Sequence, residues 1–177
     1  PAVPRSPLFR PYHGLLSDVS SAGGLVFLAC GPDGVSICEL GTMNEVNHVP
    51  LAHEAGDVLV SGGIVYATNG DQGIKVLQSS GNSLTLLASW IHPQGYRMDH
   101  LSLYGSYLFA SYRYGVQILG VTNPSAPTAV SSFAVGADEV SDLTIADGKL
   151  YVTQPNRGLR VYGLSNPASP NLLGSFD

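Results

Sequence analysis

Apolar and polar residues follow one another in short runs that predict β-strands, and no stretch has the period of an amphipathic helix. Four times, a short apolar strand that carries an aromatic residue is followed a few positions later by a glycine that opens another strand. The aromatics are Phe27, Tyr66, Phe109 and Tyr151, and the glycines are Gly34, Gly73, Gly115 and Gly158. The pattern returns about every 42 residues, a period that is typical of a propeller-type repeat array when its content is strand-like.

Each repeat is predicted to run strand, tight turn, strand, polar loop, strand, turn, strand. The tight turns fall at Gly23-Gly24, Gly62-Gly63, Gly105-Ser106 and Asp147-Gly148, dipeptides that tolerate the positive φ of primed hairpin turns. The first strands are expected at 18–22, 57–61, 100–104 and 142–146, and the second at 25–30, 64–68, 107–111 and 150–153. The third are expected at 35–40, 74–77, 116–121 and 159–164, and the fourth at 46–52, 84–91, 128–135 and 171–176.

The connection between the third and fourth strands is the most distinctive segment of the repeat. It reads Asn123-Pro124-Ser125-Ala126-Pro127 in the third repeat and Asn166-Pro167-Ala168-Ser169-Pro170 in the fourth. An Asn side chain can hydrogen-bond its own backbone, Pro fixes φ, and the residue before Pro is driven out of helical space. Both segments are therefore expected to form rigid turns.

These units resemble LVIVD-type propeller repeats. The resemblance rests on Gly158-Leu159-Arg160-Val161-Tyr162 and Gly115-Val116-Gln117-Ile118-Leu119, each followed by its Asn-Pro segment. The second repeat is weakly similar, and the first is similar only at its glycines and aromatic, so the resemblance extends over residues 15–177. It implies a β-propeller of a kind often found in exported or surface-attached bacterial and archaeal proteins, and it brings no shared catalytic motif.

The sequence therefore predicts an all-β fold, a β-propeller built from four-stranded antiparallel blades. The expected division is a Pro-rich N-terminal arm at 1–14 and blades at 15–55, 56–96, 97–137 and 138–177. A blade buries its faces against neighbouring blades, so four blades can close as a small ring, pair with a second copy, or form part of a larger ring. We favour a ring that is incomplete or is completed by a partner, because residue 177 falls at the end of a fourth strand.

Composition narrows the classes of function. With 12% charged and 44% hydrophobic residues, the chain suits a compact β domain. A net charge of −5 with eight Lys and Arg and no basic stripe argues against nucleic acid and anionic membrane surfaces as partners. No apolar run reaches the ~20 residues that a membrane-spanning helix needs. The first residue is Pro, which a cleaved signal peptide or a shortened chain would explain.

The two cysteines, Cys30 and Cys38, fall on neighbouring strands of one hairpin. Counting across the loop places Cys30 opposite Val35 and Cys38 opposite Phe27. Alternation along the strands then directs the two sulfurs to opposite faces of the sheet. We therefore expect two buried free thiols rather than a disulfide.

Four residues hold one equivalent position at the start of the innermost strand, where they are expected to surround the mouth of a central channel. They are Asp18, Asp57, His100 and Asp142. The simpler interpretation is a side chain that accepts backbone N–H bonds from its own blade or the next one. The alternative is a cation or polar-ligand site formed by carboxylate oxygens and one imidazole.

A second candidate site lies in the loops between second and third strands and between repeats, which share one side of the array. Tyr112, Arg113 and Tyr114 occupy a loop that is Gly-Pro-Asp or Asn-Gly-Asp-Gln in other repeats, and Tyr and Arg are enriched in interface hot spots. Together with Tyr96 and Arg97 they are predicted to contact a protein or a glycan; the alternative is a tyrosine packed on the adjacent blade. His92 and His53 are expected to be solvated loop residues.

The chain contains no hydrolase nucleophile motif, phosphate-binding loop or zinc motif. We therefore expect a non-catalytic interaction scaffold without a cofactor, located outside the cell, at its surface or in the periplasm. The expected partner is another protein, or a second copy that completes the propeller, within a multi-subunit complex. The alternative function is an enzyme or sensor that binds a cation or small ligand at the channel mouth.

Overall fold

The computed structural model describes residues 15–177, and the arm expected at 1–14 lies outside the described residues. Blade 1 consists of β1 (Asp18–Ala22), β2 (Leu25–Ala29), β3 (Val35–Glu39) and β4 (Glu45–Val49). Blade 2 consists of β5 (Val58–Ser61), β6 (Ile64–Thr68), β7 (Ile74–Ser80) and β8 (Ser83–Trp90). Blade 3 consists of β9 (Met98–Tyr104), β10 (Tyr107–Tyr112), β11 (Gly115–Gly120) and β12 (Thr128–Ala134). Blade 4 consists of β13 (Asp142–Ala146), β14 (Lys149–Gln154), β15 (Gly158–Gly163) and β16 (Asn171–Phe176).

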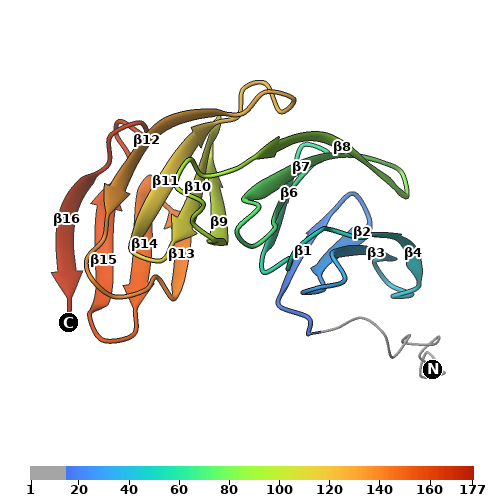
Figure 1. Ribbon diagram of the computed structural model, residues 1–177, viewed down its shortest axis with the longest axis horizontal. Helices are drawn as coiled ribbons and strands as arrows, with labels where there is room; N and C mark the ends of the chain where they lie inside the picture. Colours follow the sequence, from blue (N-terminus) through green and yellow to red (C-terminus); the bar gives the residue numbers. More distant parts are fainter. Residues whose placement is uncertain (1–14) are drawn as a thin grey trace. The chain divides into compact units, whose positions relative to one another are not determined.

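Each blade is one antiparallel sheet whose four strands pair in chain order (Figure 1). The all-β class and the four-stranded propeller blades predicted from the sequence are confirmed. Each of the expected strands is present, with ends that differ by at most a few residues. Within residues 15–177, no helix is long and apolar enough to cross a bilayer.

The first hairpin turn of each blade has the predicted primed geometry. Both central residues have positive φ at Gly23-Gly24, Gly62-Gly63 and Asp147-Gly148, as a type I′ turn requires. At Gly105-Ser106 only the glycine has positive φ, which is the pattern of a type II′ turn. These turns set the register of the two innermost strands of each blade.

The Asn-Pro segments are rigid turns, as predicted. Asn123 Oδ1 accepts a hydrogen bond from the Ser125 N–H at 3.1 Å, and Asn166 Oδ1 accepts one from the Ala168 N–H at 3.2 Å. The Ser131 hydroxyl of β12 donates to the Ala168 carbonyl at 2.6 Å, which ties blade 3 to the turn of blade 4.

The repeated glycine at the start of the third strand is required by a close approach of the fourth strand. A β-carbon at Gly73 would lie 2.0 Å from the Trp90 carbonyl oxygen, and one at Gly158 would lie 2.0 Å from the Phe176 carbonyl oxygen. Gly73 also has a φ of +75°, in the left-handed region. The repeated glycine is thus required by close packing of the third and fourth strands as well as by its backbone conformation.

Contacts divide the chain into two compact units, the first ending at Ile91 and the second running from His92 to Asp177. The first unit holds blades 1 and 2, and Phe27 and Ile37 of blade 1 share a core with Val65 and Leu77 of blade 2. Phe27 is the aromatic of the first repeat, so this repeat position contributes to the core of the first unit.

The second unit holds blades 3 and 4. Phe109 and Ile118 of blade 3 pack with Leu150, Val152 and Tyr162 of blade 4. Phe109 is the aromatic of the third repeat, so the same repeat position supplies the core in both units.

We expect Gly73→Ala to lower the free energy of unfolding by about 3 kcal/mol or more, because left-handed strain of about 1–2 kcal/mol adds to a backbone clash. Gly81→Ala is the matched control, since Gly81 has a φ of +55° but no atom within 4 Å of its β-carbon position. The control should lose only the strain energy. Equal losses in urea unfolding would contradict the close-approach explanation.

Candidate functional site

A cluster of three aromatic rings lies at one end of blade 3. Tyr112 ends β10, and His92 and Tyr96 belong to the segment that leads into β9. The Tyr96 and Tyr112 rings are stacked, with centroids 5.2 Å apart and planes 9° apart. The His92 ring is tilted against both, at 4.8 Å from Tyr96 and 5.2 Å from Tyr112. We call His92, Tyr96 and Tyr112 the aromatic cluster.

The aromatic cluster runs from the interior to the surface. His92 is 6% exposed, Tyr112 is half-buried, and Tyr96 is 41% exposed. Burial lowers the pKa of His92 and is the main reason that the pKa of Tyr112 is raised, with a smaller rise from Tyr96 and an opposing hydrogen bond to Ser132. The exposed Tyr96 ring therefore packs against two rings that are more buried than itself.

The loop after Tyr112 adds an exposed cation and a second exposed tyrosine. The Arg113 guanidinium lies 5.0 Å from the centroid of the Tyr114 ring, and Tyr114 is 40% exposed. Arg113 also forms an ion pair with Glu139 at 3.2 Å. This pair is exposed, so it contributes little to stability but orients the arginine.

The five predicted interface residues form two contacting pairs and one residue that is paired elsewhere. Tyr96 and Tyr112 are brought together, and Arg113 lies over Tyr114. Arg97 is turned to Asp99, its ion-pair partner at 2.7 Å.

His92 was not predicted to take part, and the expectation that it is a solvated loop residue is wrong. Its ring is buried and packs against both Tyr96 and Tyr112. The following Pro93 and the nearby Tyr96 give no sequence signal that distinguishes a packed His from a solvated one. His53, in contrast, is exposed and forms an ion pair with Asp71 at 3.1 Å.

Of the four residues predicted to surround a channel mouth, Asp18 and Asp57 lie in the first unit, and His100 and Asp142 lie in the second. In the first unit, Asp18 Oδ2 accepts a hydrogen bond from the Val58 N–H of β5 at 3.0 Å. Ser20 Oγ accepts a second one from the Val60 N–H at 3.1 Å. Asp18 therefore joins blade 1 to the backbone of blade 2, as in the simpler of the two interpretations.

In the second unit, His100 Nδ1 lies 4.0 Å from Asp142 Oδ1, and that same oxygen accepts the Leu143 N–H at 2.7 Å. The Asp57 N–H in the first unit donates to Thr68 Oγ1 at 2.9 Å. Among residues 15–177, no group of three or more His, Cys, Asp and Glu side chains is arranged to hold a metal ion.

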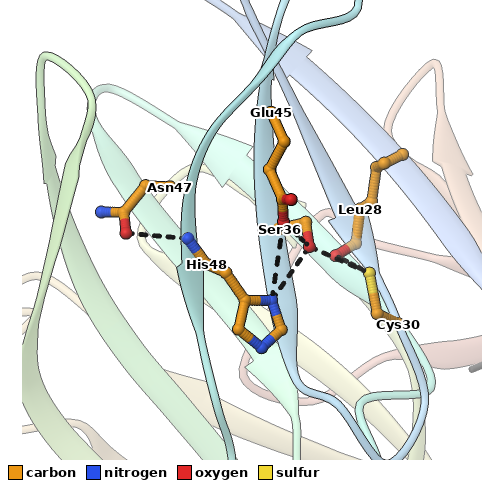
Figure 2. A network of polar contacts seen from close by, with 6 residues as sticks. All are labelled: Leu28, Cys30, Ser36, Glu45, Asn47 and His48. Atoms are coloured by element: carbon orange, nitrogen blue, oxygen red, sulfur yellow. Dashed lines mark hydrogen bonds and ion pairs between the residues drawn. The ribbon is translucent and has the colours of Figure 1, made fainter. Parts of the chain in front are cut away.

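A separate polar network lies on the face of blade 1 opposite the core of its unit (Figure 2). The Ser36 hydroxyl donates to Glu45 Oε1 at 3.0 Å and lies 3.0 Å from His48 Nδ1. The Cys30 thiol lies 3.4 Å from Ser36 Oγ and 3.5 Å from the Leu28 carbonyl oxygen.

Ser, His and Glu are the residue types of a hydrolase triad, but their arrangement here is different. In a triad, one imidazole nitrogen faces the serine and the other faces the acid. Here the same His48 nitrogen faces Ser36 and lies 3.9 Å from Glu45, and Ser36 is 1% exposed. The network satisfies a buried hydroxyl and presents no accessible nucleophile.

The predicted register around the two cysteines is wrong by one residue. Cys38 pairs with Val26, and the Cys30 N–H donates to the Gly34 carbonyl at 2.8 Å. Both sulfurs therefore belong to the same face of the sheet. Their rungs are nevertheless about 13 Å apart along the strands, which exceeds the ~7 Å that a disulfide can span between Cα atoms. Both thiols are free and buried, as predicted, but for this different reason.

Comparison with known proteins agrees with this architecture. The LVIVD repeat model matches residues 95–135 and 137–177. Blades 3 and 4 are LVIVD repeats. The resemblance predicted from the sequence is thereby confirmed for these residues, and Tyr96, Tyr112 and the Asn-Pro turns lie within LVIVD repeats. No curated protein matches the chain.

Solved structures share the fold. The computationally designed Ika4 protein has a TM-score of 0.73 at 11% identity, with 88% of this chain and 95% of that chain covered. The designed Ika8 protein has a TM-score of 0.73 at 12% identity, with 92% and 49% covered. The β-propeller domain of Cps50 (Swd1) from Myceliophteria thermophila has a TM-score of 0.74 at 12% identity, with 92% and 58% covered. The chain thus spans about half the length of the last two, and identities this low show the fold alone.

We expect acid to destabilise the protein through His92. The Gln94 N–H donates to His92 Nδ1 at 3.2 Å, which requires a neutral imidazole. Since burial lowers the folded-state pKa below the ordinary value of 6.5, this stability is complete above pH 6.5 and is lost as the pH falls through the folded-state pKa. Urea unfolding at about pH 7.5 and about pH 5 should show a smaller acid loss in His92→Gln than in the wild type. His53→Gln should retain the wild-type loss; an unchanged loss in His92→Gln would contradict the assignment.

The cysteine geometry predicts that neither thiol reacts quickly with Ellman's reagent in the folded protein, while both react after unfolding. Burial, then Glu45 and Cys30, raise the pKa of the Cys38 thiol, which keeps it protonated and slow to react. Leu40→Cys is the control, since Leu40 is exposed and should add one fast thiol. A disulfide between Cys30 and Cys38 in the folded protein would disprove the register.

Proposed function

We propose that this chain is a non-catalytic propeller scaffold that binds a protein partner through the aromatic cluster and the adjoining Arg113 and Tyr114. The observation that carries the proposal is the stack of Tyr96 on Tyr112, supported beneath by buried His92. Aromatic side chains with few rotatable bonds present a large contact area at low entropic cost, and a stacked ring loses still less freedom on binding.

The surroundings favour a protein surface as the ligand. Arg97 and Arg113, which follow Tyr96 and Tyr112 in the chain, are each paired with an acid, at 2.7 Å and 3.2 Å, so the charges beside the tyrosines are locally neutralised. A polar rim around exposed aromatic rings is the usual composition of a protein interface. A partner that supplies its own charges can exchange these exposed pairs at little cost.

The absence of a catalytic role is part of the proposal. It is supported by the His48 geometry, which leaves Ser36 without a separate acid and base. It is supported also by Asp18, whose carboxylate is used by the backbone of the next blade. Export or attachment to the cell surface belongs to the proposal as well, and rests on the LVIVD resemblance.

The test is affinity capture from the native proteome, quantified by mass spectrometry, with the wild-type chain and the double variant Tyr96→Ser/Tyr114→Ser as baits. A partner should be retained by the wild type and lost by the double variant, and titration of that purified partner should show binding weakened by about thirtyfold or more, as for an aromatic hot spot.

Tyr104→Ser is the matched control. Tyr104 is exposed at the opposite end of the β9–β10 hairpin, beside the Gly105 turn, so its loss should leave capture unchanged. Equal capture by all three baits would remove this surface from consideration. Binding of the wild type to a glycan array, abolished in the double variant, would replace the protein partner by a glycan.

A further inference from the structure

In blades 2, 3 and 4, the residue three positions after the repeat aromatic contacts the segment that leads into its blade. The Asn69 amide of blade 2 accepts a backbone N–H of that segment at 3.0 Å. The Gln154 amide of blade 4 donates to a backbone carbonyl of its segment at 2.7 Å. In blade 3 the same position holds Tyr112, which contacts its segment by stacking on Tyr96. Blade 3 therefore uses aromatic contacts where blades 2 and 4 use a hydrogen bond.

The aromatic contacts of blade 3 continue to the surface, whereas the two amides do not. Asn69 is 0% exposed and Gln154 is 3% exposed. Tyr96 is 41% exposed and Tyr114 is 40% exposed. Connecting the segment to its blade does not require exposed rings, because an amide does so in blades 2 and 4. The two exposed tyrosines therefore offer a surface for a ligand that packs on aromatic rings.

We propose that the occupant of this surface is the proline-rich segment 1–14 of a second copy of this chain, an inference that rests on the function proposed above. Pro1, Pro4 and Pro7 recur at every third residue. A polyproline II helix has three residues per turn, so in that conformation the three rings would share one side. Pro-x-x-Pro ligands bind aromatic surfaces in this way, because their preformed conformation loses little entropy on binding.

The charge of the segment complements the rest of the chain. Arg5 and Arg10 give residues 1–14 a net charge of +2 with no acid. Residues 15–177 hold six Lys and Arg and all thirteen Asp and Glu, a net charge of −7. Glu139, whose side chain is 65% exposed, is paired with Arg113 at 3.2 Å and gives an arginine of the segment an acid to contact beside Tyr114. Opposite charges of this kind steer association and select the partner.

A second copy can supply the segment without any other protein. The contact is heterologous, because one chain contributes residues 1–14 and the other contributes Tyr96 and Tyr114. Every copy carries both halves, so the proposal predicts association that depends on the concentration of this protein alone.

The first test measures binding of a fluorescently labelled peptide of residues 1–14 by anisotropy. The receiving protein is the full chain with Pro4→Ala/Pro7→Ala, so that its own segment competes less. Tyr96→Ser/Tyr114→Ser in the receiver should weaken binding by about thirtyfold or more, as for an aromatic hot spot. Tyr104→Ser is the matched control and should leave binding unchanged. A peptide with Pro4→Ala/Pro7→Ala should bind about tenfold or more weakly than the natural one.

The second test measures self-association of the full chain by light scattering over a range of concentrations. The wild type should associate, and Pro4→Ala/Pro7→Ala and Tyr96→Ser/Tyr114→Ser should each weaken association. Combining the two changes should bring no further loss, because both remove the same contact. A wild-type chain that stays monomeric at all concentrations would overturn the proposal.

A peptide that fails to bind, or that binds the Tyr96→Ser/Tyr114→Ser receiver as well as the Tyr104→Ser receiver, would also overturn it. This failure is separable from failure of the proposed function. If the peptide fails but capture of another protein still depends on Tyr96 and Tyr114, the surface binds a partner other than this segment. If both fail, the surface is not a binding site.

Discussion

Each blade in this protein has apolar side chains on both faces of a thin sheet, and covering those faces is the constraint on which the rest of the structure depends. A four-stranded sheet alone would leave residues such as Phe109 and Ile118 in water, and burial of one such side chain contributes about 1.5–3 kcal/mol. Stacking the sheets removes this cost at each junction between blades. The repeat aromatics Phe27 and Phe109 are therefore core residues, each at the junction between the two blades of its unit.

The same constraint explains where variation is tolerated. Strand positions that face a neighbouring blade are restricted in size and polarity, and Gly73 and Gly158 are restricted by the adjacent outer strand. In blade 3 the loop between the second and third strands is exposed at Arg113 and Tyr114, next to Tyr112 at the end of β10. Tyr112 connects the restricted strand positions to the exposed loop, because its half-buried ring packs on buried His92 and also stacks with exposed Tyr96. The proposed binding surface at Tyr96 is thus connected to the interior of the blade through Tyr112 and His92.

Residue types alone are a poor guide to chemistry in such a fold. Ser36, His48 and Glu45 have the composition of a triad, yet both polar partners converge on one hydroxyl to satisfy it in a buried position. Asp18 begins a strand at a repeated position that suggests a ligand, yet its carboxylate accepts a backbone N–H of the next blade. In both cases the polar group is used to complete hydrogen bonding within the sheets, as buried polar groups generally must be.

The sequence by itself determined the all-β class, the sixteen strands of the described residues, the primed turns and the Asn-Pro turns, because each depends on local signals of alternation, glycine and proline. It also identified blades 3 and 4 as LVIVD repeats. The sequence did not predict the strand register at Cys38. Alternation shows which residues of one strand share a face, but it does not show which residue of the neighbouring strand lies opposite. The sequence also did not predict the burial of His92. Its ring packs on Tyr96 of its own segment and on Tyr112 at the end of β10, and only the folded blade brings these two tyrosines together. The tertiary structure alone decided which repeated positions are covered and which, like Phe176, are left exposed, since coverage depends on the neighbouring sheet rather than on the residue itself.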